Sequence, residues 1–207
     1  MTSPPALWLV RSDPRIAPTS LHAEERRRAL AFAQAMIHDR YAAAHTALRL
    51  LLAARLGVAP RQVALTREPC PVCGASHGRP VVVGGTPHFS LAYSGDRCLL
   101  ALADTAIGVD MERIPARGVV TGLVPDLHPR EQAELAALPE NERPLAFART
   151  WVRKEAYLKG HGTGLTRGLS TDYVGTGTAP AGGLPGWTIA DVTMDGSCTA
   201  AIAIRSG

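Results

Sequence analysis

Hydrophobic and polar residues alternate along the chain in two patterns, one typical of short buried strands and one typical of amphipathic helices. The apolar run at residues 6–10, Ala-Leu-Trp-Leu-Val, predicts a buried strand. Residues 21–56 are rich in alanine and leucine and predict two helices that are broken near residues 38–39. The second helix, residues 40–56, carries leucines on one face and ends before Gly57.

The remainder of the chain contains further loops, helices and strands. Residues 66–88 are rich in Pro, Gly and Cys and predict a loop, as do residues 175–186. One helix is expected to begin at Pro129, and a longer one covers residues 144–158 and ends at Gly160. Apolar runs predict strands near residues 87–91, 98–103, 106–112, 187–192 and 198–204. Helices followed by strands, with that order recurring later, predict an α+β fold.

The composition is that of a globular protein with a hydrophobic core. Hydrophobic residues make up 46% of the 207 residues, and the mean hydropathy is +0.03. No apolar run approaches the roughly 18 residues that span a bilayer, and residues 1–5 lack the basic start and apolar stretch of a secretion signal. Four cysteines do not indicate a disulfide scaffold. We therefore expect a cytoplasmic protein with free thiols and no membrane partner.

The net charge of +4 is unevenly distributed. Residues 1–104 carry twelve basic against seven acidic side chains, whereas residues 105–207 carry ten against eleven. A basic half beside a nearly neutral half favours a phosphorylated ligand. A nucleic-acid-binding protein would show a denser basic run interleaved with aromatic residues, which make up only 5% of this chain. Nucleic acid is therefore not expected as a partner.

Lysine is almost absent from the sequence. Only Lys154 and Lys159 are lysines, and both lie close to Glu155, whereas twenty positive charges elsewhere are arginines. Lysine is a compact, titratable point charge, while arginine is a planar fork that stays protonated. We interpret the two lysines as parts of a chemical site rather than as surface charges.

Two carboxylates, Asp110 and Glu112, are separated by one residue on the predicted strand 106–112. Because side chains alternate between the faces of a strand, both carboxylates point the same way, while Val109 and Met111 point to the other face. Two neighbouring like charges repel, and a cation between them relieves the repulsion. The alternative is a solvated strand end, which is the better explanation for such a pair taken alone.

The long helix predicted after Pro144 supplies a third carboxylate. Trp151, Glu155 and Lys159 are spaced four residues apart and form one stripe on the helix. The alternative for the last two is an ordinary surface ion pair. Three carboxylates on two rigid elements would suit Mg²⁺, which normally also holds water and substrate phosphate. The residues favour metal-assisted phosphoryl-type transfer, provided that the three carboxylates lie close together.

These motifs resemble those of a known family. Gly108-Val-Asp-Met-Glu112 is followed by Trp151-Val-Arg-Lys-Glu-Ala-Tyr-Leu-Lys159 and Gly162-Thr-Gly-Leu165, as in the 4′-phosphopantetheinyl transferases. Gly78-Arg-Pro80 resembles the family's Gly-Lys-Pro motif, and Phe89-Ser-Leu-Ala-Tyr-Ser-Gly-Asp96 resembles its Phe-(Asn/Ser)-Leu-Ser-His-Ser-Gly-Asp motif. The best fit is to the two-domain type named after the surfactin-synthetase activator. The acidic and lysine motifs are specific at this spacing, whereas Gly-Arg-Pro alone would mean little.

The resemblance implies a fold and a reaction. The fold would be a pseudo-symmetric pair of similar α+β halves, residues 1–105 and 106–207, with the active site between them. The reaction would transfer 4′-phosphopantetheine from coenzyme A to a serine of an apo acyl or peptidyl carrier protein and release adenosine 3′,5′-bisphosphate. Polyketide and non-ribosomal peptide synthases are the expected pathways, although fatty-acid carriers stay open. Family analogy favours a monomer.

The resemblance also assigns roles to the charged residues of the second half. Asp110, Glu112 and Glu155 would hold Mg²⁺ on the pyrophosphate of coenzyme A. Glu155 is also the candidate base for the serine hydroxyl, directly or through water. Lys159 would neutralise the phosphates or protonate the leaving group, and Lys154 is a further candidate for the same cluster.

Arginines of the first half are assigned to the coenzyme in the same way. Arg40 lies nine residues before Arg49, which is the family's spacing, and is expected to bind the coenzyme 3′-phosphate. The alternative is a solvated arginine at a helix start. Arg79 replaces the family's lysine and keeps the positive charge beside a phosphate.

The chain departs from the family where Ala92 and Tyr93 replace Ser-His. The family's histidine contacts coenzyme phosphate, and these two positions are therefore expected at the coenzyme site. Tyr93 can donate one hydrogen bond but brings no positive charge, so we expect weaker coenzyme binding or a shifted pose. One alternative is a transferase-like module that binds carrier proteins with little or no catalysis. Another is a different metal-dependent phosphoryl enzyme, which would leave Arg79 unexplained.

Cys70-Pro-Val-Cys73-Gly, with His77 close behind, resembles half of a zinc site. A structural zinc ion needs four ligands, and no second Cys/His pair stands at zinc-finger spacing. A metal-free loop is the favoured interpretation, with zinc as the alternative.

Overall fold

The structure is a computed structural model that describes residues 4–13 and 20–206. The expectation that no secretion signal is present was based on residues 1–5. Of these, residues 1–3 lie outside the part of the chain that the structure describes. Its strands are β1 (Ala6–Arg11), β2 (Leu65–Arg67), β3 (Pro80–Val82), β4 (His88–Ser94), β5 (Arg97–Ala103), β6 (Ile107–Arg113), β7 (Trp187–Val192) and β8 (Cys198–Arg205). Its α-helices are α1 (Ala23–Leu30), α2 (Ala35–Leu56), α3 (Arg117–Leu123), α4 (Pro129–Ala137) and α5 (Arg143–His161). Short 3₁₀ helices span Pro60–Gln62, Val124–Asp126 and Gly164–Arg167.

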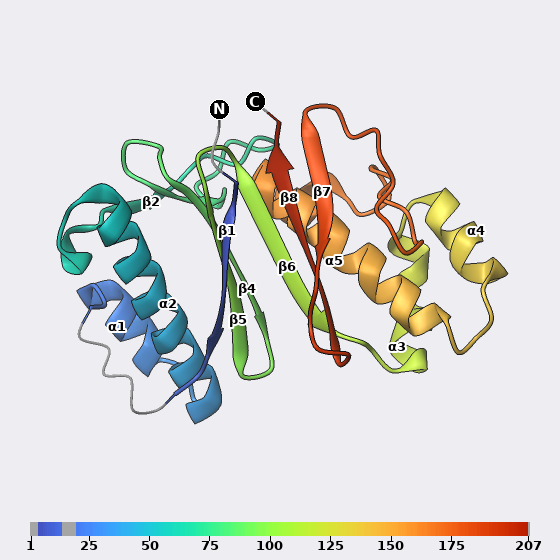
Figure 1. Ribbon diagram of the computed structural model, residues 1–207, viewed down its shortest axis with the longest axis horizontal. Helices are drawn as coiled ribbons and strands as arrows, with labels where there is room; N and C mark the ends of the chain where they lie inside the picture. The colour runs from blue at the N-terminus through green and yellow to red at the C-terminus, as the bar shows by residue number, and fades with distance from the viewer. Residues whose placement is uncertain (1–3, 14–19, 207) are drawn as a thin grey trace.

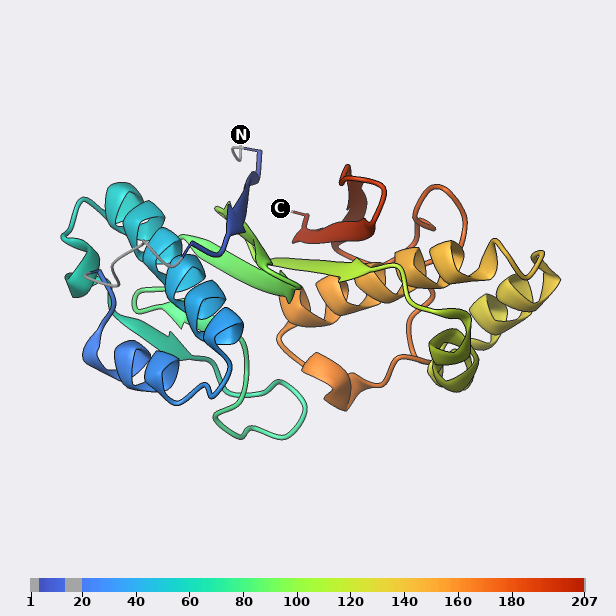
Figure 2. The same cartoon turned by 90° about the horizontal axis from the view of Figure 1, so that it is seen from below.

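The described chain forms two three-stranded antiparallel sheets that share one topology. The first sheet has the order β1-β5-β4 and the second β6-β8-β7, so in each the last strand lies between the first and the second. Each sheet carries a long helix, α2 or α5, which follows its first strand in the sequence (Figure 1). The predicted α+β fold is confirmed, and the two sheets with their helices lie side by side (Figure 2).

Strand β5 is buried on both faces and connects the two cores. Leu100 and Leu102 pack with Leu48 and Leu52 of α2 on one face. On the other face, Leu99, Ala101 and Ala103 pack with residues of the second sheet, among them Ile107, Val109 and Met111 of β6. Burial on both faces explains the nearly continuous apolar sequence of this strand. The two sheets therefore form one continuous hydrophobic interior rather than two separate ones.

Helix α5 lies directly on the backbone of β6 at two glycines. A Cβ atom at Gly108 would come within 1.9 Å of the carbonyl oxygen of Ala156 and 2.3 Å of the nitrogen of Gly160. A Cβ atom at Gly160 would in turn meet the Trp187 ring at 2.6 Å. Only glycine permits this close approach of a helix to a strand. The helix ends at Gly162, whose φ of 84° is left-handed and typical of a helix C-terminus.

The predicted helix break in the first half is in the wrong place. Residues 38–39 belong to the first turns of α2, and the interruption between α1 and α2 lies at residues 31–34. The error has a physical reason, since a carboxylate such as Asp39 is favourable near the N-terminus of a helix and does not mark a break.

Two further elements differ from the sequence predictions. The predicted loop at 66–88 contains most of β2 and all of β3, which pair antiparallel. Helix α3 was not predicted, and its sequence, Arg-Gly-Val-Val-Thr-Gly-Leu, has the low helix propensity of two glycines and three β-branched residues. Such short elements form because of tertiary packing rather than local preference. None of the described helices combines the length and the apolar composition needed to cross a bilayer.

We predict that Gly108→Ala lowers the free energy of unfolding by about 3 kcal/mol or more, because its Cβ overlaps helix backbone that cannot move independently of α5. The matched control is Gly118→Ala in α3, where a Cβ meets nothing within 4 Å and the helix gains about 0.5–1 kcal/mol. Urea unfolding followed by circular dichroism measures both variants. Equal stability of the two variants would contradict the close contact at Gly108.

Candidate active site

The paired carboxylates lie on one face of β6, as the alternation of strand side chains predicts. Val109 and Met111 belong to the core between the sheets. Asp110 faces away from that core and is only 4% exposed, while Glu112 is half-buried. The hydroxyl of Ser94, at the end of β4, lies 3.4 Å from a carboxylate oxygen of Glu112. The face that carries the carboxylates is the one covered by α5, because Ala201, paired with Asp110, packs on that helix.

Helix α5 brings Glu155 and Lys159 to this face. The ammonium group of Lys159 lies 2.5 Å from Asp110 Oδ1, which joins the two elements by an ion pair. Glu155 is half-buried one helical turn before Lys159. The contact between Gly108 and Gly160 fixes this arrangement. Asp110 lies two residues after Gly108, and Lys159 lies directly before Gly160.

The three carboxylates repel one another in a partly buried setting. Burial raises the pKa of Asp110, and the ion pair with Lys159 offsets only part of this effect. Burial, together with the charge of Asp110, also raises the pKa of Glu112 and of Glu155. A cation among them would stabilise their charged forms.

The donor atoms of this cluster suit Mg²⁺ in chemistry but lie too far apart for one ion to bind all three. Asp110 Oδ2 is buried and has no hydrogen-bond partner among the described residues, and oxygen donors of this kind are those Mg²⁺ prefers. Among the described residues, however, only Cys70, Cys73 and His77 have three ligand atoms within 4.8 Å of one another. The half-buried side chains of Glu112 and Glu155 would therefore have to turn toward Asp110 to share one ion.

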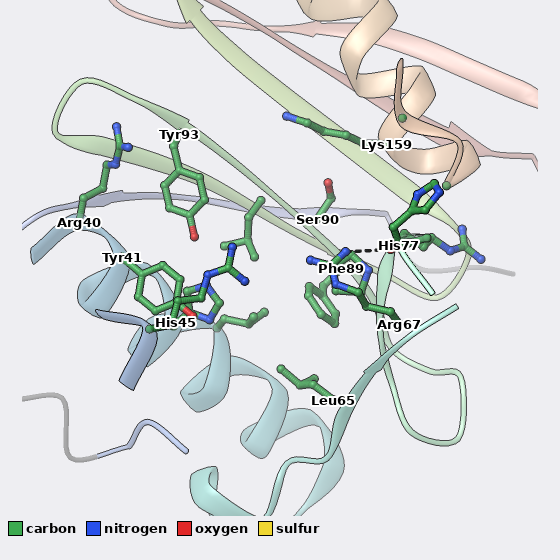
Figure 3. A pocket seen from close by; sticks show the side chains of 18 of the residues that line it. Arg40, Tyr41, His45, Leu65, Arg67, His77, Phe89, Ser90, Tyr93 and Lys159 are labelled. Carbon is green, nitrogen blue, oxygen red and sulfur yellow. Dashed lines mark hydrogen bonds between the residues drawn. The ribbon is translucent and has the colours of Figure 1, made fainter. Parts of the chain in front are cut away.

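A cavity of about 470 Å³ lies between the two halves of the chain beside Lys159. Figure 3 shows Arg40, Tyr41 and Tyr93 in one part of it and Arg67 and His77 in another. Among the described residues that line it, the basic side chains are four arginines and one lysine: Arg28, Arg40, Arg67, Arg79 and Lys159. No carboxylate from the described part of the chain lines it. Such a cavity is suited to a ligand that carries several negative charges.

The two arginines assigned from the sequence both line the cavity. Arg79 binds Glu68 through two nitrogens, at 2.6 and 3.1 Å, and donates a third hydrogen bond of 2.8 Å to the carbonyl of Gly160. It therefore connects the loop of the first half to helix α5 of the second. Arg40 donates to the carbonyl of Gly95 at 2.6 Å, which holds its guanidinium at the cavity.

Tyr93 lies beneath Arg40 and lines the same cavity. The guanidinium carbon of Arg40 is 5.1 Å from the centre of the Tyr93 ring. The hydroxyl of Tyr93 is buried and is directed toward Tyr41 (Figure 3), and it has no hydrogen-bond partner in the part of the chain that the structure describes. Burial raises the pKa of Tyr93 well above its usual range, so this side chain is a neutral donor. An unpaired buried hydroxyl facing a cavity is free to donate to a ligand.

Ala92, in contrast, is not among the described residues that line the cavity. It is 1% exposed and packs between the two sheets with Leu99 and Val109. Neighbouring residues of a strand point to opposite faces, so Ala92 and Tyr93 cannot share one site.

Lys154 is likewise not among the described residues that line the cavity. It is 2% exposed, its ammonium group lies 2.7 Å from Glu131 of α4, and it donates to the carbonyl of Asp172. Glu131 is fully buried and also accepts a hydrogen bond of 2.8 Å from the backbone of Val174. Lys154 therefore fastens α5 to α4 and the following loop. Successive residues of a helix are rotated by about 100°, which is why Lys154 and Glu155 face different surroundings.

Several cavity residues were not identified from the sequence. One of them is His45, whose ring lines the cavity and stacks on Tyr41 with centroids 4.0 Å apart. The four-residue spacing of these two rings on α2 would have indicated a shared face. Arg28 and Arg67 carry no such signal, because nothing in the sequence separates them from the other arginines.

Glu25 of α1 contacts two side chains of α2 next to the cavity. It contacts His45 Nδ1 at 3.1 Å and forms an ion pair with Arg49. Burial alone would raise the pKa of Glu25, but the hydrogen bonds from His45 and Arg49 lower it to about 2. Arg49 is buried and also donates to the carbonyls of Pro60 and Val63, so its role is to hold the fold together.

We predict that Lys154→Met lowers the free energy of unfolding by about 3 kcal/mol, because Glu131 stays buried without its counter-charge. Adding Glu131→Gln removes that uncompensated charge and should recover part of the loss. Urea unfolding at pH 7 of the single and double variants measures the difference. A Lys154→Met variant as stable as the parent would show that the ion pair does not fasten α5 to α4.

Comparison with known proteins agrees with the motifs and the geometry. Residues 106–182 match the model of the 4′-phosphopantetheinyl transferase superfamily. The 4′-phosphopantetheinyl transferase HetI of Nostoc sp. is 31% identical over 173 residues, which cover 80% of this chain and 70% of HetI. A relative from Synechocystis sp. is 30% identical over 178 residues, which cover 82% of this chain and 70% of the relative. The chain therefore belongs to the 4′-phosphopantetheinyl transferase family.

Proposed function

We propose that the protein transfers 4′-phosphopantetheine from coenzyme A to a serine of an apo acyl or peptidyl carrier protein. The observation that carries this proposal is a cavity lined by four arginines and Lys159, whose Lys159 end adjoins three carboxylates. Coenzyme A carries a pyrophosphate and a 3′-phosphate, which such a cavity can neutralise. The family relationship supports the same reaction.

The cavity residues would bind and orient the coenzyme. Arg40 is assigned to the 3′-phosphate, while Arg79 and Lys159 are assigned to the pyrophosphate. Arg79 is already held by Glu68 and Gly160, so little conformational freedom is lost when a phosphate binds. Tyr93 would donate its free hydroxyl where the family's histidine contacts phosphate.

The residues of the second half would carry the chemistry. Asp110, Glu112 and Glu155 are the groups that would hold Mg²⁺, which when bound neutralises charge on the pyrophosphate. Glu155 accepts the proton of the serine hydroxyl. The serine oxygen then bonds to the phosphorus nearest the pantetheine, and the bond from that phosphorus to the bridging oxygen breaks. Adenosine 3′,5′-bisphosphate leaves with the electron pair, and Lys159 balances its charge.

The proposed residue roles differ between the two halves of the chain. Residues 1–105 would supply most coenzyme contacts, and residues 106–207 the carboxylates and Lys159, as in the two-domain type of the family. The shared topology of the two sheets supports this division. Because one chain supplies both sides of the cavity, a monomer is sufficient. A cytoplasmic location would give access to coenzyme A.

The position of Tyr93 supports a second candidate function. Its ring lies under Arg40 inside the cavity, where it takes space and brings no charge. A coenzyme pocket weakened in this way would leave a module that binds carrier proteins without transferring the group. Turnover separates the two functions.

The deciding experiment is intact-mass spectrometry of apo carrier proteins incubated with coenzyme A and Mg²⁺. We expect a gain of one phosphopantetheine on an acyl or peptidyl carrier, and its loss without metal. Glu155→Gln should slow transfer by about 100-fold or more, because a positioned base contributes 10²–10⁴-fold. The matched control is Glu140→Gln at an exposed site remote from the cavity, which should react as the parent does. Carrier binding without any mass gain would favour the second function.

Tyr93→Phe tests whether the tyrosine hydroxyl contacts the coenzyme. The dissociation constant for coenzyme A should rise about tenfold, because a hydrogen bond to a charged phosphate contributes about 1.5 kcal/mol. The Tm of the ligand-free protein should not fall, because the hydroxyl is unpaired there. Calorimetric titration and thermal unfolding measure the two quantities. Tyr93→His, which restores the family's residue, should tighten binding, and unchanged affinity in both variants would remove Tyr93 from the coenzyme site.

A further inference from the structure

The loop between β2 and β3 brings three soft ligands together. The sulfur atoms of Cys70 and Cys73 and a ring nitrogen of His77 all lie within 4.8 Å of one another. Cys73 Sγ lies 3.0 Å from His77 Nε2. Cys70 is buried, whereas Cys73 and His77 are exposed, so the cluster is open to solvent on one side. The transferase chemistry uses none of these three side chains.

The backbone of this loop already has the shape of a metal-binding knuckle. The backbone N–H groups of Val72 and Cys73 are directed at the sulfur of Cys70. Gly74 has a φ of 72°, a left-handed conformation that glycine adopts without strain, and its N–H donates to the carbonyl of Cys70 at 2.8 Å. A second bond of 2.8 Å joins the Cys70 nitrogen to the Ala75 carbonyl and closes the turn.

The ligand types select one class of metal. Two thiolates and an imidazole suit Zn²⁺, whereas Mg²⁺ and Ca²⁺ prefer oxygen donors. The carboxylates around Asp110 have the opposite preference. The chain therefore offers two metal sites that differ in chemistry, and zinc in the loop would not compete for the ion of the active site.

We propose that Cys70, Cys73 and His77 bind Zn²⁺ through two sulfur atoms and the Nε2 nitrogen, with water in the fourth position. This site replaces the metal-free loop expected from the sequence, and it does not rest on the transferase activity. Water would complete the four-coordinate geometry of zinc, as it does in zinc sites that have three protein ligands.

The place of this site in the fold gives the ion a role. His77 is followed by Gly78 and Arg79, and Arg79 reaches across to the carbonyl of Gly160. Gly78 is packed so tightly that a Cβ there would come within 2.3 Å of the Glu68 carbonyl oxygen. A zinc ion that ties His77 to Cys70 would hold the segment that carries Arg79. Zinc is therefore a positioning element at the edge of the cavity.

Metal analysis of the purified full chain tests the proposal. The protein is loaded with Zn²⁺ under reducing conditions, which prevent a disulfide between Cys70 and Cys73, and is then desalted and analysed by mass spectrometry of the metal. We expect one zinc ion per chain. Cys73→Ser and His77→Ala should each lose it, because each removes one of three protein ligands. Cys198→Ser removes a cysteine outside the cluster and should keep the ion.

Cobalt substitution supplies a second measurement that does not depend on affinity for zinc. Co²⁺ bound by thiolates gives a sulfur-to-metal charge-transfer band, and Cys73→Ser should lower its intensity by about half or abolish it. Cys73 and His77 are exposed, so their variants should retain the parent's circular dichroism spectrum. No zinc in the loaded parent, or the same zinc content in both ligand variants as in the parent, would overturn the proposal.

Discussion

The active-site arrangement depends on the close packing of helix α5 against strand β6. Two glycines, Gly108 and Gly160, let the helix backbone approach the strand backbone more closely than any side chain would permit. This contact fixes both the distance between the elements and their register. Asp110 and Lys159 then meet as an ion pair, and Glu155 faces the same strand one turn earlier. A side chain at either glycine would move all three charged groups at once.

Charge is divided between the two halves of the chain in a way that suits a phosphorylated ligand. The cavity is lined by arginines of the first half, and the carboxylates of the second half stand next to it. Lys159 belongs to both regions, since it lines the cavity and pairs with Asp110. Arg79 joins the halves through Gly160. Positive charge is thus gathered at the cavity, while negative charge is gathered on β6 and α5 beside it.

The two lysines show how neighbouring residues acquire separate roles. Lys159 is partly exposed at the cavity and forms an ion pair with Asp110 there. Lys154 is buried against Glu131, where desolvation lowers its pKa and the ion pair offsets part of that effect. Scarcity of lysine in the sequence singled out both residues, but only one of them belongs to the site.

The sequence by itself determined features that follow from local periodicity. The alternation of a strand placed Asp110 and Glu112 on one face, and the helical spacing put Glu155 and Lys159 on one stripe, because both repeats are fixed by backbone geometry. The tertiary structure decided which faces are buried. It turned Ala92 into the core, gathered Arg28 and Arg67 at the cavity, and closed a loop around three metal-type ligands. These outcomes depend on contacts between residues distant in the chain, which no local pattern encodes.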